Sequence, residues 1–244
     1  MDIYVVTGAG RGLGRHLALA LEAGGVQVAA FGRDGAALAQ TAALGAGRIH
    51  PVVCDVADPA SVRAAFAAVD RLGLLKGLVN NAAVYPRRDS LAETAESLMA
   101  VMATNFGGTA ACTYEALDRL CQRGEGRILN VATFADVAPI AASSAYATSK
   151  GAARILTRAL VADLADRFPR IIISDWMPGI LATEMGLPDG LDPALAAGWG
   201  ARLTLMQDDF LQGSTWERDR EILPPRGIKG RLIDRLRGIK PRHL

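Results

Sequence analysis

Short apolar runs alternate with helical patterns along most of this chain, and this alternation constrains the fold more than any other feature. The runs are apolar at nearly every position, as expected of strands that are covered on both faces of a sheet. Helical segments separate them, so neighbouring strands are expected to be parallel. The pattern predicts strands at about 3–7, 26–31, 49–54, up to 80, 127–133 and 171–176, and helices at about 12–23, 34–44, from 58, 98–122 and 144–168.

This order of elements predicts a single domain, an α/β fold with a doubly wound parallel β-sheet of about seven strands. The 244 residues are enough for one such domain with a sizeable core. We assign residues 1–223 to it, with a last strand within 213–217 and a substrate lid around 183–207. Residues 224–244 are assigned to a basic C-terminal tail.

Charge is distributed unevenly between these two parts. Residues 224–244 contain seven Lys or Arg and one acid, a net +6, so the rest of the chain carries −4 of the total +2. The net negative charge of residues 1–223 gives no indication of nucleic-acid binding. The tail has apolar residues at helical spacing, and packing on a second subunit, a solvated tail and binding to an anionic surface are all open for it.

Composition argues against several other classes of protein. Half of the residues are hydrophobic, which argues against a disordered chain. Three cysteines without C-x-x-C spacing and three histidines without ligand spacing predict neither a disulfide framework nor a metal site. There is no run of about 18 apolar residues to span a membrane. The first residues lack the order of a signal peptide, so we expect a cytoplasmic protein.

Residues 7–14 read T-G-A-G-R-G-L-G and lie between the first predicted strand and the first predicted helix. Glycines at this place permit a tight turn and let the backbone approach a pyrophosphate, and the free N–H groups of the helix start attract its charge. The alternative is a glycine-rich turn without a ligand. The context predicts a dinucleotide site with contacts from Gly8, Gly10, Arg11, Gly12, Leu13 and Gly14.

The T-G-x-x-x-G-x-G spacing of this turn resembles the short-chain dehydrogenase/reductase family, whose members have a Rossmann fold. The resemblance extends from residue 1 to about residue 183, roughly three quarters of the chain. Each further landmark could arise by chance, but together and in the family's order they form a specific signal. They are Asp55 after the third strand, N-N-A-A at 80–83 where the family has N-N-A-G, Asn105, Y-x-x-x-K at 146–150, and P-G-x-x-x-T at 178–183.

The resemblance implies an NAD(P)-dependent oxidoreductase and assigns roles to these residues. Asn105 resembles the asparagine of the family's proton relay, which kinks its helix and holds a water that links the lysine to solvent. Lys150 also holds the hydroxyls of the nicotinamide ribose. The cofactor is expected to contact Asp55, Val56, Asn81, Ala82, Lys150, Pro178, Gly179 and Thr183.

The end of the second predicted strand indicates which cofactor is preferred. An acid there favours the ribose hydroxyls of NAD and repels the 2′-phosphate of NADP, but this chain has Gly32 at that position, followed by Arg33. The guanidinium group of Arg33 suits a phosphate, and Arg11 is a second candidate contact. Asp34 is expected to cap the next helix. NADP(H) is therefore preferred over NAD(H), unless both arginines are merely solvated.

Tyr146 and Lys150 are four residues apart, so on one helix they share a face. A nearby ammonium group lowers the pKa of a tyrosine, whose reference value is about 10, so Tyr146 is the candidate general acid/base. An ordinary helix pair is the alternative. Most members of the family have a serine thirteen residues before the tyrosine, where this chain has Thr133. Threonine keeps the hydroxyl that orients a substrate oxygen, with an added methyl group.

Other side chains near the predicted centre have more than one interpretation. Ser143 and Ser144 are expected to cap the helix that carries the tyrosine. Asn105 interrupts a helical pattern and is expected to kink it, with a purely structural role as the alternative. Asp136 either meets a polar substrate group or is an exposed loop acid. Together with Phe134, Tyr85 and residues 185–199 it is a candidate to line the substrate pocket.

These features predict an NADP(H)-dependent oxidoreductase that interconverts a carbonyl and a secondary alcohol of a small molecule. The resemblance implies a homodimer or homotetramer formed through the helices near residues 105 and 146. The second hypothesis is a non-catalytic NADP(H) sensor on the same fold, favoured by Thr133 but not by the intact Tyr146, Lys150 and Asn105. The chain lacks the G-x-S-x-G motif of serine hydrolases and the P-loop of triphosphatases.

Overall fold

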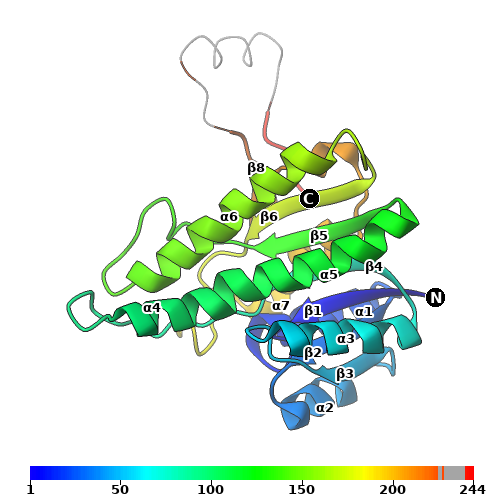
Figure 1. Ribbon diagram of the computed structural model, residues 1–244, viewed down its shortest axis with the longest axis horizontal. Helices are drawn as coiled ribbons and strands as arrows, with labels where there is room; N and C mark the ends of the chain where they lie inside the picture. Colours follow the sequence, from blue (N-terminus) through cyan, green and yellow to red (C-terminus); the bar gives the residue numbers. More distant parts are fainter. Residues whose placement is uncertain (225–226, 228–239) are drawn as a thin grey trace.

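The structure, a computed structural model, describes residues 1–224, residue 227 and residues 240–244. Its centre is a sheet with the strand order β3-β2-β1-β4-β5-β6-β7-β8 (Figure 1). Neighbouring strands are parallel except β7 and β8, which are antiparallel. The order reverses between β1 and β4, which confirms the doubly wound α/β fold. The strands are β1 Asp2–Thr7, β2 Gln27–Gly32, β3 Ile49–Val53, β4 Leu74–Asn80, β5 Gly126–Val131, β6 Ile171–Met177, β7 Thr215–Glu217 and β8 Arg220–Ile222.

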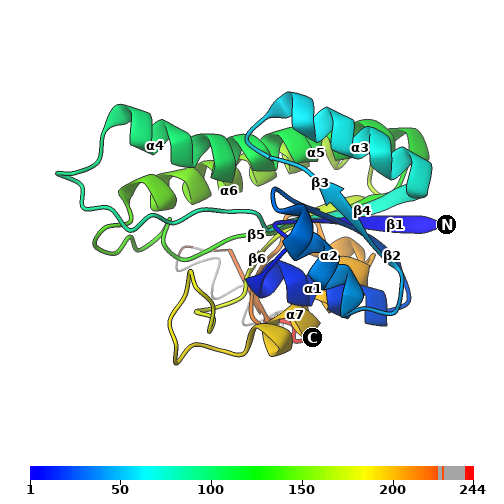
Figure 2. The ribbon, with the colours of Figure 1, turned by 90° about the horizontal axis from the view of Figure 1, so that it is seen from below.

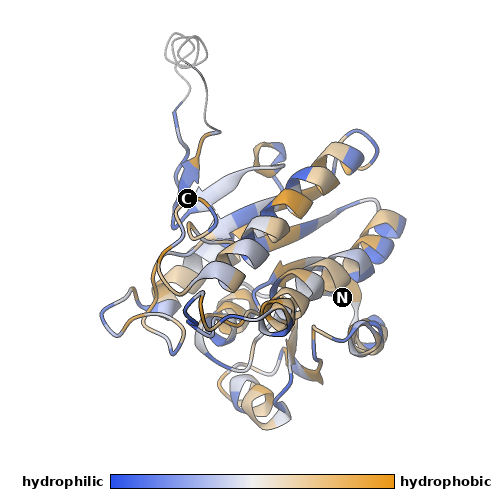
Figure 3. Ribbon diagram, turned by 60° about the vertical axis from the view of Figure 1, so that its left-hand side comes forward, coloured by the Kyte–Doolittle hydropathy of each residue, from blue (hydrophilic) through white to orange (hydrophobic). Residues whose placement is uncertain are grey.

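Helices cover both faces of this sheet (Figure 2). Because successive residues of a strand point to opposite faces, Tyr4 and Val6 of β1 pack with α1 and α7, whereas Ile3 and Val5 pack with α3 and α5. The helices carry both hydrophobic and hydrophilic residues, as helices with one buried face do (Figure 3). They are α1 Gly12–Ala23, α2 Gly35–Ala43, α3 Pro59–Leu72, α4 Ala95–Met102, α5 Gly108–Arg123, α6 Ser144–Leu164 and α7 Pro193–Leu205.

The predicted helix cap at Asp34 is confirmed, and Asp58 forms a second cap of the same kind. The carboxylate of Asp34 accepts a hydrogen bond from the backbone N–H of Ala37 at 3.1 Å. Asp58 accepts one from Ala60 at 2.9 Å, and Pro59 occupies the first turn of α3. Each cap satisfies an N–H group that has no partner within its own helix.

The predicted caps of α6 are wrong. Ser143 is at the N-cap position, but its hydroxyl donates to the carbonyl of Ile140 at 2.6 Å and makes no cap hydrogen bond. The Ser144 hydroxyl is buried and has no hydrogen-bond partner among the described residues. The loop before α6 turns back on itself, and Ser143 stabilises that turn instead of the helix.

The helix predicted at 98–122 consists of three consecutive parts. α4 begins at Ala95, where Thr94 and Ser97 form a capping box. Residues Ala103–Gly107 then form one π-helical turn, and α5 continues from Gly108. The interruption predicted at Asn105 is therefore confirmed, and it takes the form of a π-bulge.

The region after β6 is more regular than the sequence indicates. α7 packs against α1 and buries small residues, so residues 193–205 of the predicted lid contribute to the core. β7 corresponds to the predicted last strand, and β8 follows it as a short antiparallel strand that the sequence does not predict. Its three residues, Arg-Glu-Ile, have no apolar pattern. Most of the predicted tail 224–244 lies outside the described residues.

Candidate active site

The glycine turn joins the carboxyl end of β1 to α1. Gly8 and Gly12 have φ angles of +67° and +52°, a backbone conformation that favours glycine. A Cβ at Gly14 would lie 2.1 Å from the carbonyl oxygen of Gly8, so α1 starts too close to the turn for any side chain. This cradle of bare backbone at a helix start fits the pyrophosphate of a dinucleotide.

Asn81 and Ala82, which follow β4, lie directly against this turn. Their backbone N–H groups both donate to the hydroxyl of Thr7 at 2.9 Å. The side-chain amide of Asn81 donates to the carbonyl of Thr7, also at 2.9 Å. The residues predicted to contact the cofactor on β1 and β4 are therefore held as one unit at the switch point of the sheet.

The candidate adenosine contacts follow β2 and β3, on the same edge of the sheet. Arg33 is exposed immediately after β2. Asp55 is half-buried after β3, and its carboxylate accepts a hydrogen bond from Ala57 at 3.0 Å. Val56 is buried against Gly108 at the start of α5. The backbone thus brings Arg33, Asp55 and Val56 to the edge where the glycine turn lies.

Residues 179–187 pass across the glycine turn. Gly179, after the buried Pro178, has a φ of +89° that redirects the chain. Thr183 lies next to Gly12, since a Cβ on that glycine would be 3.6 Å from its methyl group. Arg11 forms an ion pair with Glu184 at 2.5 Å, with both side chains about three-quarters exposed. Arg11 is therefore held toward this segment rather than toward Arg33.

Tyr146 and Lys150 lie on the first turns of α6, facing the carboxyl end of β5. Lys150 is only 4% exposed, and its ammonium group donates to the carbonyl of Val131 at 2.8 Å. Burial lowers the pKa of Lys150 to about 8, and the carboxylate of Asp175 opposes this shift. Lys150 has no other hydrogen bond to the described residues, so two of its three N–H donors are available to a ligand.

The environment of Tyr146 differs from the prediction. Burial raises its pKa, and a hydrogen bond with the hydroxyl of Thr133 opposes that shift. The ring of Tyr85 stacks on the ring of Tyr146 with centroids 4.5 Å apart. The predicted lowering of the Tyr146 pKa by Lys150 is not seen, because the ammonium group of Lys150 is directed to the carbonyl of Val131.

Thr133 lies after β5, in contact with Tyr146. Its hydroxyl accepts a hydrogen bond from the backbone N–H of Ala135 at 3.2 Å and also bonds to Tyr146. A hydroxyl next to the phenol is the arrangement expected of a group that orients a substrate oxygen. The structure thus places Thr133 beside Tyr146, and its role toward a substrate stays a prediction.

Asn105 connects the π-bulge to two other parts of the site. Its side chain accepts from the backbone N–H of Val84 at 2.8 Å and donates to the carbonyl of the same residue at 3.0 Å. It also donates to the Ser149 hydroxyl at 2.9 Å, which in turn donates to the carbonyl of Tyr146 at 2.7 Å. These bonds link the loop after β4 to α6. The water that the resemblance implies remains a prediction.

Arg87 holds the loop after β4 against the segment after β6. Its guanidinium group donates to the carbonyls of Met185 and Gly186, each at 2.8 Å. It also lies over the ring of Tyr85, 5.5 Å from its centroid. The sequence gives no signal for this contact, because the two loops are about a hundred residues apart in the chain.

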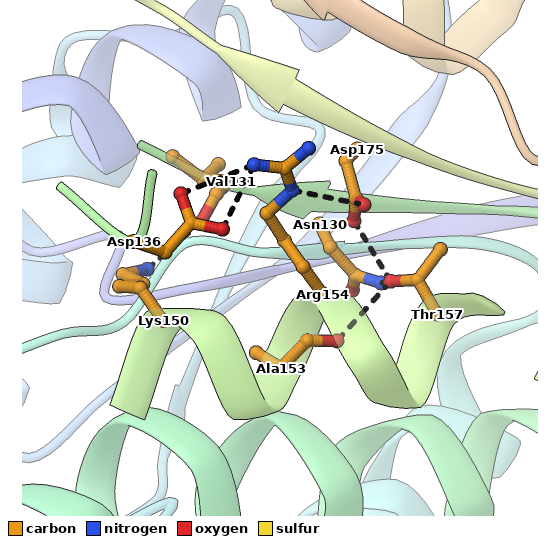
Figure 4. Close-up of polar contacts among 8 residues, drawn as sticks. All are labelled: Asn130, Val131, Asp136, Lys150, Ala153, Arg154, Thr157 and Asp175. Carbon is orange, nitrogen blue, oxygen red and sulfur yellow. Dashed lines mark hydrogen bonds and ion pairs between the residues drawn. The ribbon is translucent and has the colours of Figure 1, made fainter. Parts of the chain in front are cut away.

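Asp136 and Asp175 are joined by Arg154 of α6 (Figure 4). Asp136 accepts two hydrogen bonds from Arg154, at 2.8 and 3.1 Å, and its side chain is only 10% exposed, so it is not the exposed loop acid of the second interpretation. A contact with a polar substrate group stays a prediction. Asp175 is buried in β6 and was not predicted as part of the site. One signal was available, because it is the single acid within an apolar strand.

Two features were sought among the described residues and not found. Among the described residues, no group of three or more His, Cys, Asp or Glu side chains has the arrangement of a metal site. In the same part of the chain, none of the helices has both the length and the apolar character needed to cross a bilayer.

Known proteins resemble this chain over most of its length. The family described as short chain dehydrogenase matches residues 2–191. Galactitol 2-dehydrogenase (L-tagatose-forming) of Cereibacter sphaeroides is 35% identical over 80% of this chain and 77% of its own. The short-chain reductase protein NovJ of Streptomyces niveus is 34% identical over 75% and 71%. A crystal structure of a putative gluconate dehydrogenase from Agrobacterium tumefaciens aligns with a TM-score of 0.82 and 27% identity, covering 88% and 93%.

Proposed function

The chain belongs to the short-chain dehydrogenase family, and we propose that it is an NADP(H)-dependent oxidoreductase with Tyr146 as its general acid/base. Family membership makes it an oxidoreductase that acts on CH–OH groups with a nicotinamide cofactor. The proposed acid/base role rests mainly on one observation. Thr133, Tyr146 and Lys150 lie together at the carboxyl end of β5. A small molecule with a carbonyl or secondary alcohol group is the proposed substrate.

The residues around Tyr146 support a proton transfer that accompanies hydride transfer. The nicotinamide, when bound, supplies or accepts the hydride at the substrate carbon. In reduction the Tyr146 hydroxyl donates its proton to the substrate oxygen, while the Thr133 hydroxyl holds that oxygen. In oxidation the phenolate takes the same proton back. Lys150, whose ammonium group has one hydrogen bond to the described residues, offers its remaining N–H groups to the ribose hydroxyls.

The loops around this centre support a substrate that is bound between them. Tyr85 stacks on Tyr146, Phe134 is part-exposed in the loop after β5, and Met185 is part-exposed in the segment after β6. These side chains offer aromatic and aliphatic surface to a bound substrate. The contact of Arg87 with the segment after β6 holds two of these loops together.

Turnover of a panel of ketones and secondary alcohols, followed at the nicotinamide absorbance, tests this function. We expect reduction of at least one carbonyl class with NADPH. Thr133 is the one feature that favours a non-catalytic sensor, and a sensor would bind NADPH but turn over nothing in a broad panel. That outcome would overturn the proposed activity but would still agree with the proposed cofactor site.

Thr133→Val is expected to lower kcat/KM by about 10²- to 10³-fold, because the variant keeps the shape of the side chain but lacks the hydroxyl that holds the substrate oxygen. Thr133→Ser keeps the hydroxyl and is expected to retain activity. Steady-state kinetics of the two variants on one substrate provide the comparison. Equal activity of Thr133→Val and the unmodified enzyme would show that the hydroxyl has no part in the reaction.

The preference for NADP(H) rests on Arg33. Arg33→Asp is expected to weaken NADPH binding by about 10- to 100-fold, with little loss for NADH, because it replaces a charged hydrogen-bond donor by a repelling carboxylate. Titration calorimetry with both cofactors measures this. Arg63→Asp, an equally exposed arginine on α3, is the control and should change neither affinity. Equal losses for both cofactors in Arg33→Asp would contradict the preference.

We further propose a homodimer or homotetramer formed through α4, α5 and α6, which lie side by side on one face of the sheet (Figure 2). Tyr114 of α5 and Ile155 of α6 are exposed there, and they are apolar enough to pack on a second copy. The mass in solution tests this. A reducing compartment such as the cytoplasm suits the three free cysteines.

A further inference from the structure

Arg154 of α6 lies between two carboxylates that come from different parts of the fold (Figure 4). Its Nη1 atom donates to both carboxylate oxygens of Asp136, at 2.8 and 3.1 Å. Its Nε atom lies 3.9 Å from a carboxylate oxygen of Asp175. The side chains of Arg154 and Asp136 are only 17% and 10% exposed. Water therefore competes little with this ion pair, and the two side chains hold each other in a defined place.

The inner carboxylate of the two is fixed in the core. Asp175 belongs to β6, which is buried at all seven positions, and it accepts a hydrogen bond from the Thr157 hydroxyl at 2.7 Å. Asn130 of β5 donates to the same hydroxyl at 2.9 Å. The 3.9 Å separation from Arg154 is too long for a hydrogen bond, so Asp175 attracts the guanidinium group by charge. The described hydrogen bonds of that group all go to the outer carboxylate, Asp136.

Asp136 belongs to a tight turn, residues 133–138, which we call the threonine turn. Two backbone N–H groups at its end donate to the carbonyl of Phe134, at 2.8 and 2.9 Å. At its start, the N–H group of Ala135 donates to the Thr133 hydroxyl at 3.2 Å. Thr133 and Asp136 are therefore parts of one hydrogen-bonded unit, so whatever holds the carboxylate also holds the hydroxyl.

The threonine turn contacts α6 at two places. At the first, the hydroxyl of Thr133 bonds to Tyr146. The second is the ion pair of Asp136 with Arg154, about two helical turns further along. The single glycine of α6, Gly151, lies between them, and a Cβ there would be 3.5 Å from the Cβ of Asp136. The turn thus packs closely on the face of α6 that carries the candidate acid/base.

We propose that Arg154 is a positioning residue for catalysis, which fastens the threonine turn to α6 through Asp136 and so keeps the Thr133 hydroxyl beside Tyr146. The proposal rests on the proposed function, because Thr133 acts in turnover by holding the substrate oxygen. Such a hydroxyl must be in place before the substrate arrives, since ordering it during the reaction would slow the reaction. Asp175 anchors the guanidinium group to the core and thereby fixes the far end of this connection.

Hydrogen exchange measured by NMR on the full-length protein, without substrate, tests whether Arg154 holds the turn. In Arg154→Met, which keeps the length of the side chain but not its charge, the turn should open more often. We expect the amides of Ala135, Val137 and Ala138 to exchange about tenfold faster, with no change in the amides of β5. Arg158→Met is the matched control, at an exposed arginine one helical turn later, and should leave all of these rates unchanged.

Asp136→Ala provides a second test in case Arg154→Met does not fold. It detaches the threonine turn from its own side and leaves Arg154 next to the charge of Asp175. The same amides are expected to exchange about tenfold faster. Unchanged exchange in the turn of either folded variant, or an equal acceleration in β5, would overturn the proposal. Neither measurement requires turnover, so a panel without activity would count against the proposed function alone.

With a substrate in hand, kinetics in two backgrounds separate a positioning role from a merely structural one. In the unmodified enzyme, we expect Arg154→Met to lower kcat about tenfold with KM and NADPH affinity little changed, because the hydroxyl is less often in place. In Thr133→Val there is no hydroxyl to position, so the same substitution should cost less than about twofold. Equal losses in the two backgrounds would show that Arg154 does not act through Thr133 and would contradict its role in catalysis.

Discussion

Tyr146→Phe is expected to lower kcat by about 10³-fold in both directions of the reaction, the largest kinetic effect of any substitution considered. The variant keeps the aromatic ring that stacks on Tyr85 and loses only the hydroxyl. That hydroxyl bonds to Thr133 and is the proposed proton donor to the substrate oxygen. Without it, reduction has no acid and oxidation has no base at the substrate oxygen.

The structural cost of Tyr146→Phe should be small, because a single hydrogen bond contributes about 1 kcal/mol. NADPH binding by titration calorimetry and the thermal unfolding temperature are therefore expected to stay close to those of the unmodified protein. Tyr114→Phe, at an exposed tyrosine on α5, is the matched control and should keep full activity. If Tyr146→Phe turned over substrate within a factor of ten of the unmodified enzyme, Tyr146 would not be the acid/base.

Gly14→Ala is expected to abolish cofactor binding and to destabilise the fold by about 3 kcal/mol, the largest thermodynamic effect. The added Cβ would lie 2.1 Å from the carbonyl oxygen of Gly8 and 2.6 Å from the side-chain nitrogen of Asn81. Both atoms belong to residues that shape the glycine turn. The start of α1 must therefore move away, and the N–H groups that face the pyrophosphate move with it. We expect this movement to weaken NADPH binding by more than a hundredfold, which corresponds to roughly 3 kcal/mol of binding free energy.

Gly198→Ala is the control for this substitution. Gly198 is also a helical glycine, in α7, but a Cβ there meets nothing within 4 Å. Alanine at such a position is expected to stabilise the protein by about 0.5–1 kcal/mol without affecting NADPH binding. Denaturant unfolding and calorimetry on both variants give the comparison. Equal cofactor affinity in Gly14→Ala and the unmodified protein would show that the turn does not hold the pyrophosphate.

Several elements could be predicted from the sequence because their signals are local. A buried strand needs consecutive apolar residues, and a phosphate turn needs glycines between a strand and a helix, so β1 and residues 7–14 are visible in the sequence itself. The cap at Asp34 and the interruption at Asn105 are also properties of a few neighbouring residues. The family resemblance added the order of landmarks, and the comparisons confirm the family.

Signals that depend on a distant partner were misread or missed. Ser143 has the right residue type for a cap, but the turn of the preceding loop directs its hydroxyl to Ile140. β8 has no apolar pattern, because its one buried residue is Glu221, which is paired with Arg242 of the C-terminal residues. The prediction that Lys150 lowers the pKa of Tyr146 assumed that two residues four apart on a helix are in contact. In the structure, burial raises this pKa, and the ammonium group of Lys150 is directed to Val131.

The sequence by itself therefore determined the fold and the family, since these depend on residue type and order along the chain, and it supplied the candidate catalytic side chains that the proposed function uses. Only the tertiary structure decided the electrostatics around Tyr146 and Lys150. The pKa of a buried group depends on desolvation and on charges in space, and the carboxylate of Asp175 meets Thr157 of α6 only when β6 packs against that helix. Likewise, the glycine turn predicts a nucleotide site from the sequence, but only the structure explains why position 14 must be glycine, since a Cβ there would lie 2.1 Å from the carbonyl oxygen of Gly8.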